Sequence, residues 1–113
     1  MVTHGPDDPD RASIPFAMAV AAQSAGIEVV MGFQVDGALL LKKGVADGIA
    51  ATGFVPLKEL MDIYRTYGGR FLACGPCVAA RHIMPDDFIE GATVVNAPTF
   101  VEHFITANNV LVY

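Results

Sequence analysis

The chain has 113 residues, of which 53% are hydrophobic and only 17% are charged, with a formal net charge of −5. The acidic balance argues against nucleic-acid binding, because that activity needs a basic surface for the phosphate backbone. The apolar excess predicts either a membrane protein or a subunit that buries additional surface against copies of itself.

The longest charge-free run, residues 12–27, is the segment that would have to span a membrane. It contains Pro15 and is shorter than the roughly 20 apolar residues that a membrane-spanning helix needs. Several aspartates precede it, where a signal peptide would carry basic residues. We therefore expect a cytoplasmic, self-associating protein without a membrane span, folded as a single domain over residues 1–113.

Short apolar runs alternate with helical patterns along the chain, which predicts an α/β protein with a parallel sheet of five strands. Residues 1–3 predict the end of a first strand. Asp8 is a candidate N-cap for a helix that continues to about Ala25 and that Pro15 should bend or restart. Residues 27–33 predict a buried second strand, which ends in a turn at residues 34–37.

The same alternation continues in the second half of the chain. After a short helical piece and a glycine-containing loop, Pro56 opens a helix whose apolar residues recur at the i, i+3, i+4, i+7 spacing. Two further helices are predicted, one over residues 78–83 and one that contains Phe100. Three apolar runs predict the remaining strands, at residues 70–73, 92–95 and 110–112.

Ligands of an open parallel sheet bind beyond the carboxyl ends of its strands. Four segments of this chain follow predicted strands at that edge: residues 4–5, 34–36, 74–77 and 96–97. We expect them to converge, and they contain most of the candidate site residues, which are His4, Asp36, Cys74, Cys77 and Asn96.

Cys77 is the strongest candidate for chemistry. It precedes the predicted helix at residues 78–83, where the positive end of the helix dipole favours a nucleophilic thiolate. Arg81 and His82, one turn further on, could add positive potential. The alternative is a buried, inert cysteine, which is common for free thiols. Cys74 could resolve an intermediate on Cys77, or it could only pack.

The remaining candidates have simpler explanations. Asp36 and Lys43 could polarise a bound group, but solvated loop charges are the simpler interpretation. His4 follows the first strand, and Asn96 is expected to cap the last helix or bond the turn backbone. No metal site or cofactor is predicted, because the cysteine pair lacks a second closely spaced pair of ligands.

The tetrapeptide Cys-Gly-Pro-Cys also occurs in thioredoxins. Thioredoxins place it early in the chain, after a Trp, and build most of the fold behind it. This chain has no Trp, and only 113 − 77 = 36 residues follow Cys77. A dithiol function remains open, whereas a thioredoxin topology is excluded.

Several segments together resemble the DsrE/DsrF-like family over almost the whole chain. They are THGP at residues 3–6, KKGVADG at 42–48, PLKEL at 56–60, CGPCVAARHI at 74–83, DDFIEGA at 86–92 and TFVE at 99–102. The resemblance implies a flavodoxin-like sheet with helices on both faces, assembled as homotrimers or homohexamers. Some members of this family, the TusD/YchN-like proteins of a sulfur relay, carry sulfur as a cysteine persulfide.

In those relatives the carrier cysteine precedes a helix of small residues that ends in a basic residue. The segment from Cys77 to Arg81 matches that pattern, so the resemblance implies the carrier role for Cys77. Cys74 and the Gly-Pro insert depart from it. Three functions follow: a sulfur carrier or sulfurtransferase exchanging sulfur with protein thiols, a dithiol redox or sensing subunit, and a non-catalytic oligomeric binding subunit.

Overall fold

The computed structural model describes residues 1–113. Its centre is a parallel sheet in the order β1 (Val30–Phe33), β2 (Arg70–Cys74) and β3 (Ala92–Val95). The register aligns Phe33 with Ala73, and Cys74 with Val95. The carboxyl ends of all three strands therefore lie along one edge of the sheet, as the sequence predicted.

The prediction of five strands is wrong, because residues 1–3 and 110–112 form no strand. Both segments nevertheless extend the ladder beside β1. Val2 forms a single parallel bridge with Phe33. Tyr113 exchanges backbone hydrogen bonds of 2.8 and 2.9 Å with the two residues that flank Val2. Val2 is the one residue of these two segments that forms a β-bridge, and an isolated bridge is too short for a strand.

Helices precede, connect and follow these strands: α1 (Pro9–Ser24), η1 (Val35–Leu41), η2 (Ala46–Gly48), α2 (Leu57–Thr66), α3 (Gly75–Ala80), η3 (Pro85–Asp87) and α4 (Ala97–Thr106), where η marks a 3-10 helix. Asp8 caps α1 as predicted, with its carboxylate accepting the N–H of Arg11 at 3.1 Å. The helix continues through Pro15 without interruption. None of these helices combines the length and apolar character needed to cross a bilayer.

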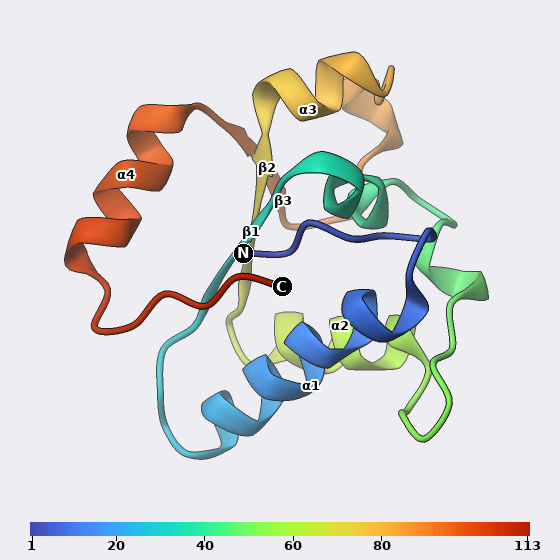
Figure 1. Ribbon diagram of the computed structural model, residues 1–113, viewed down its shortest axis with the longest axis vertical. Coiled ribbons are helices and arrows are strands. Elements are labelled where there is room, and N and C mark those ends of the chain that lie inside the picture. The colour runs from blue at the N-terminus through green and yellow to red at the C-terminus, as the bar shows by residue number, and fades with distance from the viewer.

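An aromatic cluster fills the space between the sheet and the helices α1 and α2, which lie side by side in Figure 1. Its members are Phe16, Phe33, Tyr64 and Phe71, and the closest ring centroids, those of Tyr64 and Phe71, are 5.3 Å apart. All four side chains are at most 1% exposed. Burial of each contributes roughly 1.5–3 kcal/mol of hydrophobic stabilisation.

α4 lies on the opposite face of the sheet and contacts it through Phe100, its one buried residue. Successive strand residues face opposite sides, so Leu72 points away from the aromatic cluster that contains Phe71. Phe100 of α4 packs there against Gly32, where an added Cβ would lie 2.6 Å from its ring. The predicted arrangement of helices on both faces is thus confirmed.

Candidate functional site

Loops from neighbouring strands meet closely at the carboxyl edge of the sheet. A Cβ on Gly5 would lie 2.3 Å from the carbonyl oxygen of Asp36, so only glycine lets these two loops touch. A Cβ on Gly75 would lie 3.5 Å from the side-chain oxygen of Asn96. The expected convergence of these four segments is therefore present in the fold.

The cysteine segment forms the helix α3 (Gly75–Ala80), which begins three residues earlier than predicted. Cys74 is the N-cap, and Pro76 lies in the first turn, where its fixed φ suits a helix. Cys77 is thus inside the first turn. The helix also ends earlier than predicted, because His82 adopts a left-handed φ of 53°.

The sulfur of Cys77 faces the loop that follows β1. The N–H of Val35 donates to Cys77 Sγ at 3.3 Å. Hydrogen bonds of this kind strengthen when the acceptor is ionised. Val35 holds this position with a φ of 51°, which a β-branched residue rarely adopts. Cys77 is half-buried, and its thiol is free.

Cys74 has a different environment from Cys77, although both thiols are free. Burial raises the pKa of the Cys74 thiol, and its hydrogen bond with the Cys77 thiol raises that pKa further. Cys74 is therefore a protonated thiol at neutral pH, in direct reach of Cys77.

Arg81 was expected to add positive potential at Cys77, but the structure pairs it with Asp36. Its Nε and Nη2 donate to the same carboxylate oxygen of Asp36 at 3.0 and 2.8 Å. Its Nη1 donates to the main-chain carbonyl of Cys77 at 3.2 Å. Both residues thus lie at the site, where they join η1 to α3.

His4 is held within its own loop. Its Nδ1 lies 2.8 Å from a carboxylate oxygen of Asp7, whose other oxygen accepts the N–H of Gly5 at 2.7 Å. The hydrogen bond with His4, and then that with Gly5, lower the pKa of Asp7. His4 therefore stabilises the turn that leads into α1. It lies beside the site because the next residue, Gly5, packs against Asp36.

Other candidates have structural surroundings of their own. Lys43 Nζ donates to the main-chain carbonyl of Asp86 at 3.0 Å. Lys43 lines a separate hollow of about 240 Å³, together with Lys42, Lys58, Asp62, Arg65 and Glu90. His82 is exposed and ends α3. Asn96 occupies the N-cap position of α4 without a side-chain cap bond, contrary to expectation.

Val35, whose N–H donates to Cys77, is not among the site residues predicted from the sequence. The turn composition of Gln34-Val35-Asp36-Gly37 predicts a chain reversal but not which residue turns its N–H toward the sulfur. Valine is a poor candidate for a left-handed conformation, so nothing in the sequence pointed to it.

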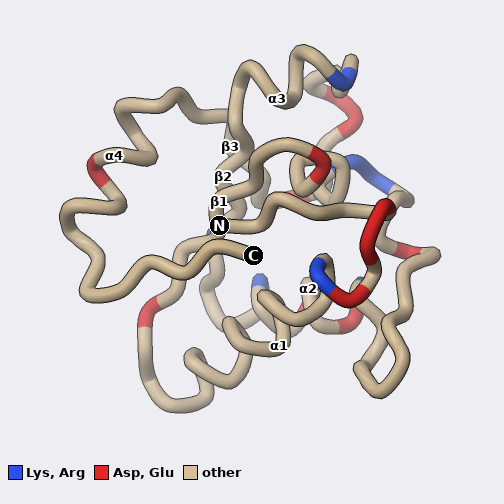
Figure 2. Tube along the Cα trace, in the orientation of Figure 1, with Lys and Arg blue, Asp and Glu red and all other residues tan.

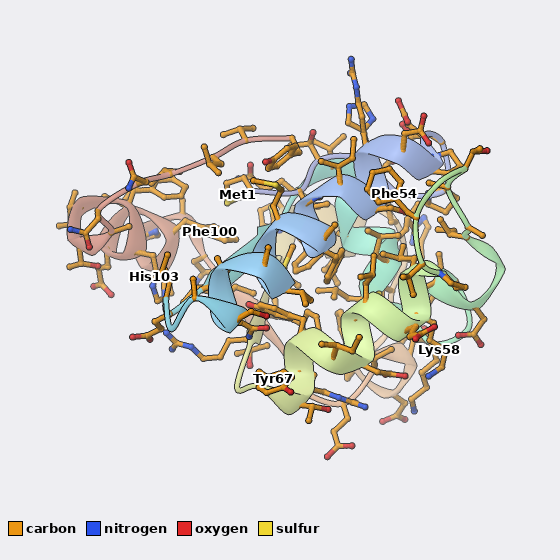
Figure 3. The ribbon with its side chains drawn as sticks, turned by 90° about the horizontal axis from the view of Figure 1, so that it is seen from below. Met1, Phe54, Lys58, Tyr67, Phe100 and His103 are labelled. Atoms are coloured by element: carbon orange, nitrogen blue, oxygen red, sulfur yellow. The ribbon has the colours of Figure 1, made fainter.

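A larger hollow lies elsewhere in the molecule. It has a volume of about 610 Å³ and lies between α1, β1, α4 and the C-terminal segment, without either cysteine in its lining. Met1, Phe100 and His103, which are labelled in Figure 3, are among its lining residues. The paired thiols, rather than this hollow, carry the reactive groups of the chain.

The chemistry available at the carboxyl edge is that of a dithiol. No third Cys, His, Asp or Glu lies close enough to form a set of three ligands with the two thiols. The fold and the site thus define a small α/β protein with a partly exposed dithiol at the carboxyl edge of a parallel sheet.

The chain belongs to the DsrE/DsrF-like family, whose model matches residues 1–113. It is 27% identical over 113 residues to the uncharacterized protein MK0008 of Methanopyrus kandleri, covering 100% of this chain and 90% of that protein. It is 26% identical over 113 residues to the uncharacterized protein MJ0989 of Methanocaldococcus jannaschii, covering 100% of this chain and 96% of the relative.

A second Methanocaldococcus jannaschii protein, the uncharacterized MJ0760, is 26% identical over 106 residues, which make up 94% of this chain but only 38% of that protein. Among solved structures, the YchN protein of E. coli superposes with a TM-score of 0.69 at 13% identity, over 92% of this chain and 84% of YchN. At that identity the likeness establishes the fold alone. The family predicted from the sequence is confirmed.

Proposed function

We propose that the protein is a cytoplasmic sulfur carrier that accepts sulfane sulfur on Cys77 and passes it to a protein thiol. The observation that carries the proposal is the position of Cys77. It lies half-exposed in the first turn after β2, with its sulfur accepting the Val35 N–H at 3.3 Å. Membership in the DsrE/DsrF-like family is consistent with sulfur relay in general.

The chemistry requires no other group than thiols. The Cys77 thiolate attacks the outer sulfur of a donor persulfide, R–S–SH. A sulfur–sulfur bond forms at Cys77 while the donor sulfur–sulfur bond breaks, and the donor leaves as the thiolate R–S⁻. An acceptor thiolate then takes the outer sulfur from Cys77 in the same way. Neither step has a net oxidation or reduction, so no cofactor is required.

A second candidate function is supported by Cys74. As the N-cap residue, it lies three positions before Cys77, and the two thiols interact. The Cys74 sulfur, once it has given up its proton to solvent, attacks Sγ of a Cys77 persulfide, forming the Cys74–Cys77 disulfide and releasing HS⁻. That reaction would make the protein a dithiol redox or sensing subunit.

The test is the intact mass of the reduced protein after exposure to inorganic polysulfide. We expect an adduct of about 32 Da that persists in Cys74→Ser and is absent in Cys77→Ser. Cys74→Ser serves as the matched control, because it removes one thiol of the same helix turn. A loss of about 2 Da that needs both cysteines would favour the dithiol function instead. An unchanged mass would refute both.

The proposal includes a homo-oligomer. Exposed apolar side chains concentrate on α4 and the following segment, with Ile105 77% and Val112 69% exposed. Residues 91–113 contain a single formally charged side chain, that of Glu102, and Figure 2 shows this sparsely charged stretch. Patches of this kind in water mark surfaces for partners, here further copies of the chain.

A further inference from the structure

We infer that Asp36 and Arg81 are positioning residues for Cys77, whose ion pair holds the loop after β1 against α3 and keeps the Val35 N–H directed at the sulfur. The inference rests on Cys77 as the reactive group of the proposed function. It assigns to an ion pair, rather than to the helix dipole, the task of fixing the surroundings of the sulfur.

The first observation is the conformation of Val35. Its φ of 51° is unfavourable for a β-branched side chain, which is also 50% exposed and gains little from packing. A strained residue persists only where surrounding contacts determine its conformation. The next residue in the chain is Asp36, and its carboxylate makes the contact that can hold Val35 in this conformation.

The second observation is the geometry of Arg81. One guanidinium reaches Asp36 with two nitrogens, at 2.8 and 3.0 Å, and the carbonyl of Cys77 with the third, at 3.2 Å. It therefore contacts the residue beside the hydrogen-bond donor and also the residue that carries the acceptor sulfur. A lysine ammonium is a single point charge and cannot reproduce this fork.

The third observation is a comparison with the other ion pairs of lysine and arginine. Lys58 and Arg65 both pair with Asp62 inside α2, and the pair of Arg70 with Glu28 spans 3.8 Å. Arg65 reaches Glu90 at 3.7 Å. The Arg81 pair, at 2.8 Å with the arginine side chain only 23% exposed, is the one close pair that joins separate elements.

The test measures the alkylation rate of Cys77 by iodoacetamide in the Cys74→Ser background, so that only one thiol reports. We expect Asp36→Asn and Arg81→Met each to slow alkylation about three- to tenfold near neutral pH, because the sulfur loses a directed donor. The double variant should be no slower than the slower single variant, because the two residues act as a unit. Arg81→Lys should restore part of the rate.

A purely structural role predicts the opposite result. Loosening the loop would expose Cys77 and speed its alkylation at every pH. Positioning predicts slowing instead, because the sulfur loses the N–H that is directed at it. Arg11→Met is the matched control, since Arg11 forms an exposed pair with Asp8 at 3.7 Å and should leave the rate unchanged. Circular dichroism confirms that each variant is folded.

Unchanged or faster alkylation in folded Asp36→Asn and Arg81→Met would overturn the inference. Additive slowing in the double variant would also overturn it. The readout is independent of sulfur transfer, so the two proposals fail separately. Slow alkylation without any polysulfide adduct on the parent protein would leave the positioning role standing and refute the carrier function.

Discussion

Gly37 is placed where η1 passes over the first residues of the chain. A Cβ at this position would lie 2.2 Å from the carbonyl oxygen of Val2 and 3.2 Å from the main-chain nitrogen of Thr3. Both contacts are backbone atoms, which cannot move aside as a flexible side chain can. The glycine therefore fixes how closely η1, which begins at Val35, approaches the sheet.

We predict that Gly37→Ala lowers the free energy of unfolding by about 2 kcal/mol, the usual effect of overpacking at a buried position. Urea unfolding followed by circular dichroism measures this change. Gly48→Ala is the matched control, because nothing lies within 4 Å of a Cβ there and its effect should stay within about 0.5 kcal/mol. Equal effects of the two substitutions would contradict the packing argument.

At the scale of single residues, sequence reasoning identified those with distinctive chemistry. Cys74, Cys77 and Asp36 were named because thiols and turn carboxylates carry recognisable functions. The pairing of Asp36 with Arg81 could not be predicted, because the two residues are 45 positions apart and only the folded chain brings them together. Val35 acts through its backbone N–H, which every residue except proline possesses.

Secondary-structure elements were predicted well where a local signal was strong. The Asp8 cap and the following proline fixed the start of α1, and the apolar stripe fixed α2. α3 was displaced because the prediction placed its start after Pro76, whereas proline and glycine fit the first turn itself. The two outer strands were predicted wrongly because Val2 alone forms a β-bridge there, and hydrophobic patterning does not show how many residues pair.

Tyr64 joins α2 to the sheet. Its hydroxyl lies 2.8 Å from the carbonyl oxygen of Arg70 and 3.1 Å from that of Val29, and the side chain is fully buried. Burial raises the pKa of Tyr64 from its ordinary value near 10 to about 12. The folded protein thus holds this proton more tightly than the unfolded chain does.

The sign of the pH dependence follows from this raised pKa. The stabilisation is complete below about pH 10, where both states are protonated, and is lost as the pH rises toward 12. In this window the free energy of unfolding should fall with pH more steeply for wild type than for Tyr64→Phe. We predict a difference between the two slopes of up to about 1.4 kcal/mol per pH unit. Urea unfolding at several alkaline pH values measures the two slopes.

Tyr64→Phe should also be less stable than wild type by about 1–2 kcal/mol at pH 7, because the carbonyl groups lose their donor. Tyr67→Phe is the matched control, since Tyr67 ends the same helix and is 72% exposed. Parallel pH curves for wild type and Tyr64→Phe would show that the buried hydroxyl does not cause the alkaline loss.

At the scale of the whole molecule, the composition indicates an excess of apolar residues but not where they lie. In the folded chain part of this surplus lies in the buried core around the aromatic cluster, and part forms an exposed surface on α4 and the C-terminal segment. The members of that surface, each at least 38% exposed, are Val101, Phe104, Ile105, Val110, Leu111 and Val112. The spacing of apolar residues in the sequence could not show that this surface is exposed, because a helix face in the core and a helix face at an interface have the same apolar pattern.

We predict that the protein sediments as an oligomer of its 12.0 kDa chain at micromolar concentration and that Ile105→Asp shifts it toward the monomer. Placing a carboxylate in a desolvated apolar interface is costly, so dissociation should rise by about tenfold or more. Met84→Asp, at a residue 61% exposed away from α4, should leave the sedimentation unchanged. A wild-type chain that sediments as a monomer would contradict the proposed assembly, and the sparsely charged C-terminal surface would then need another partner.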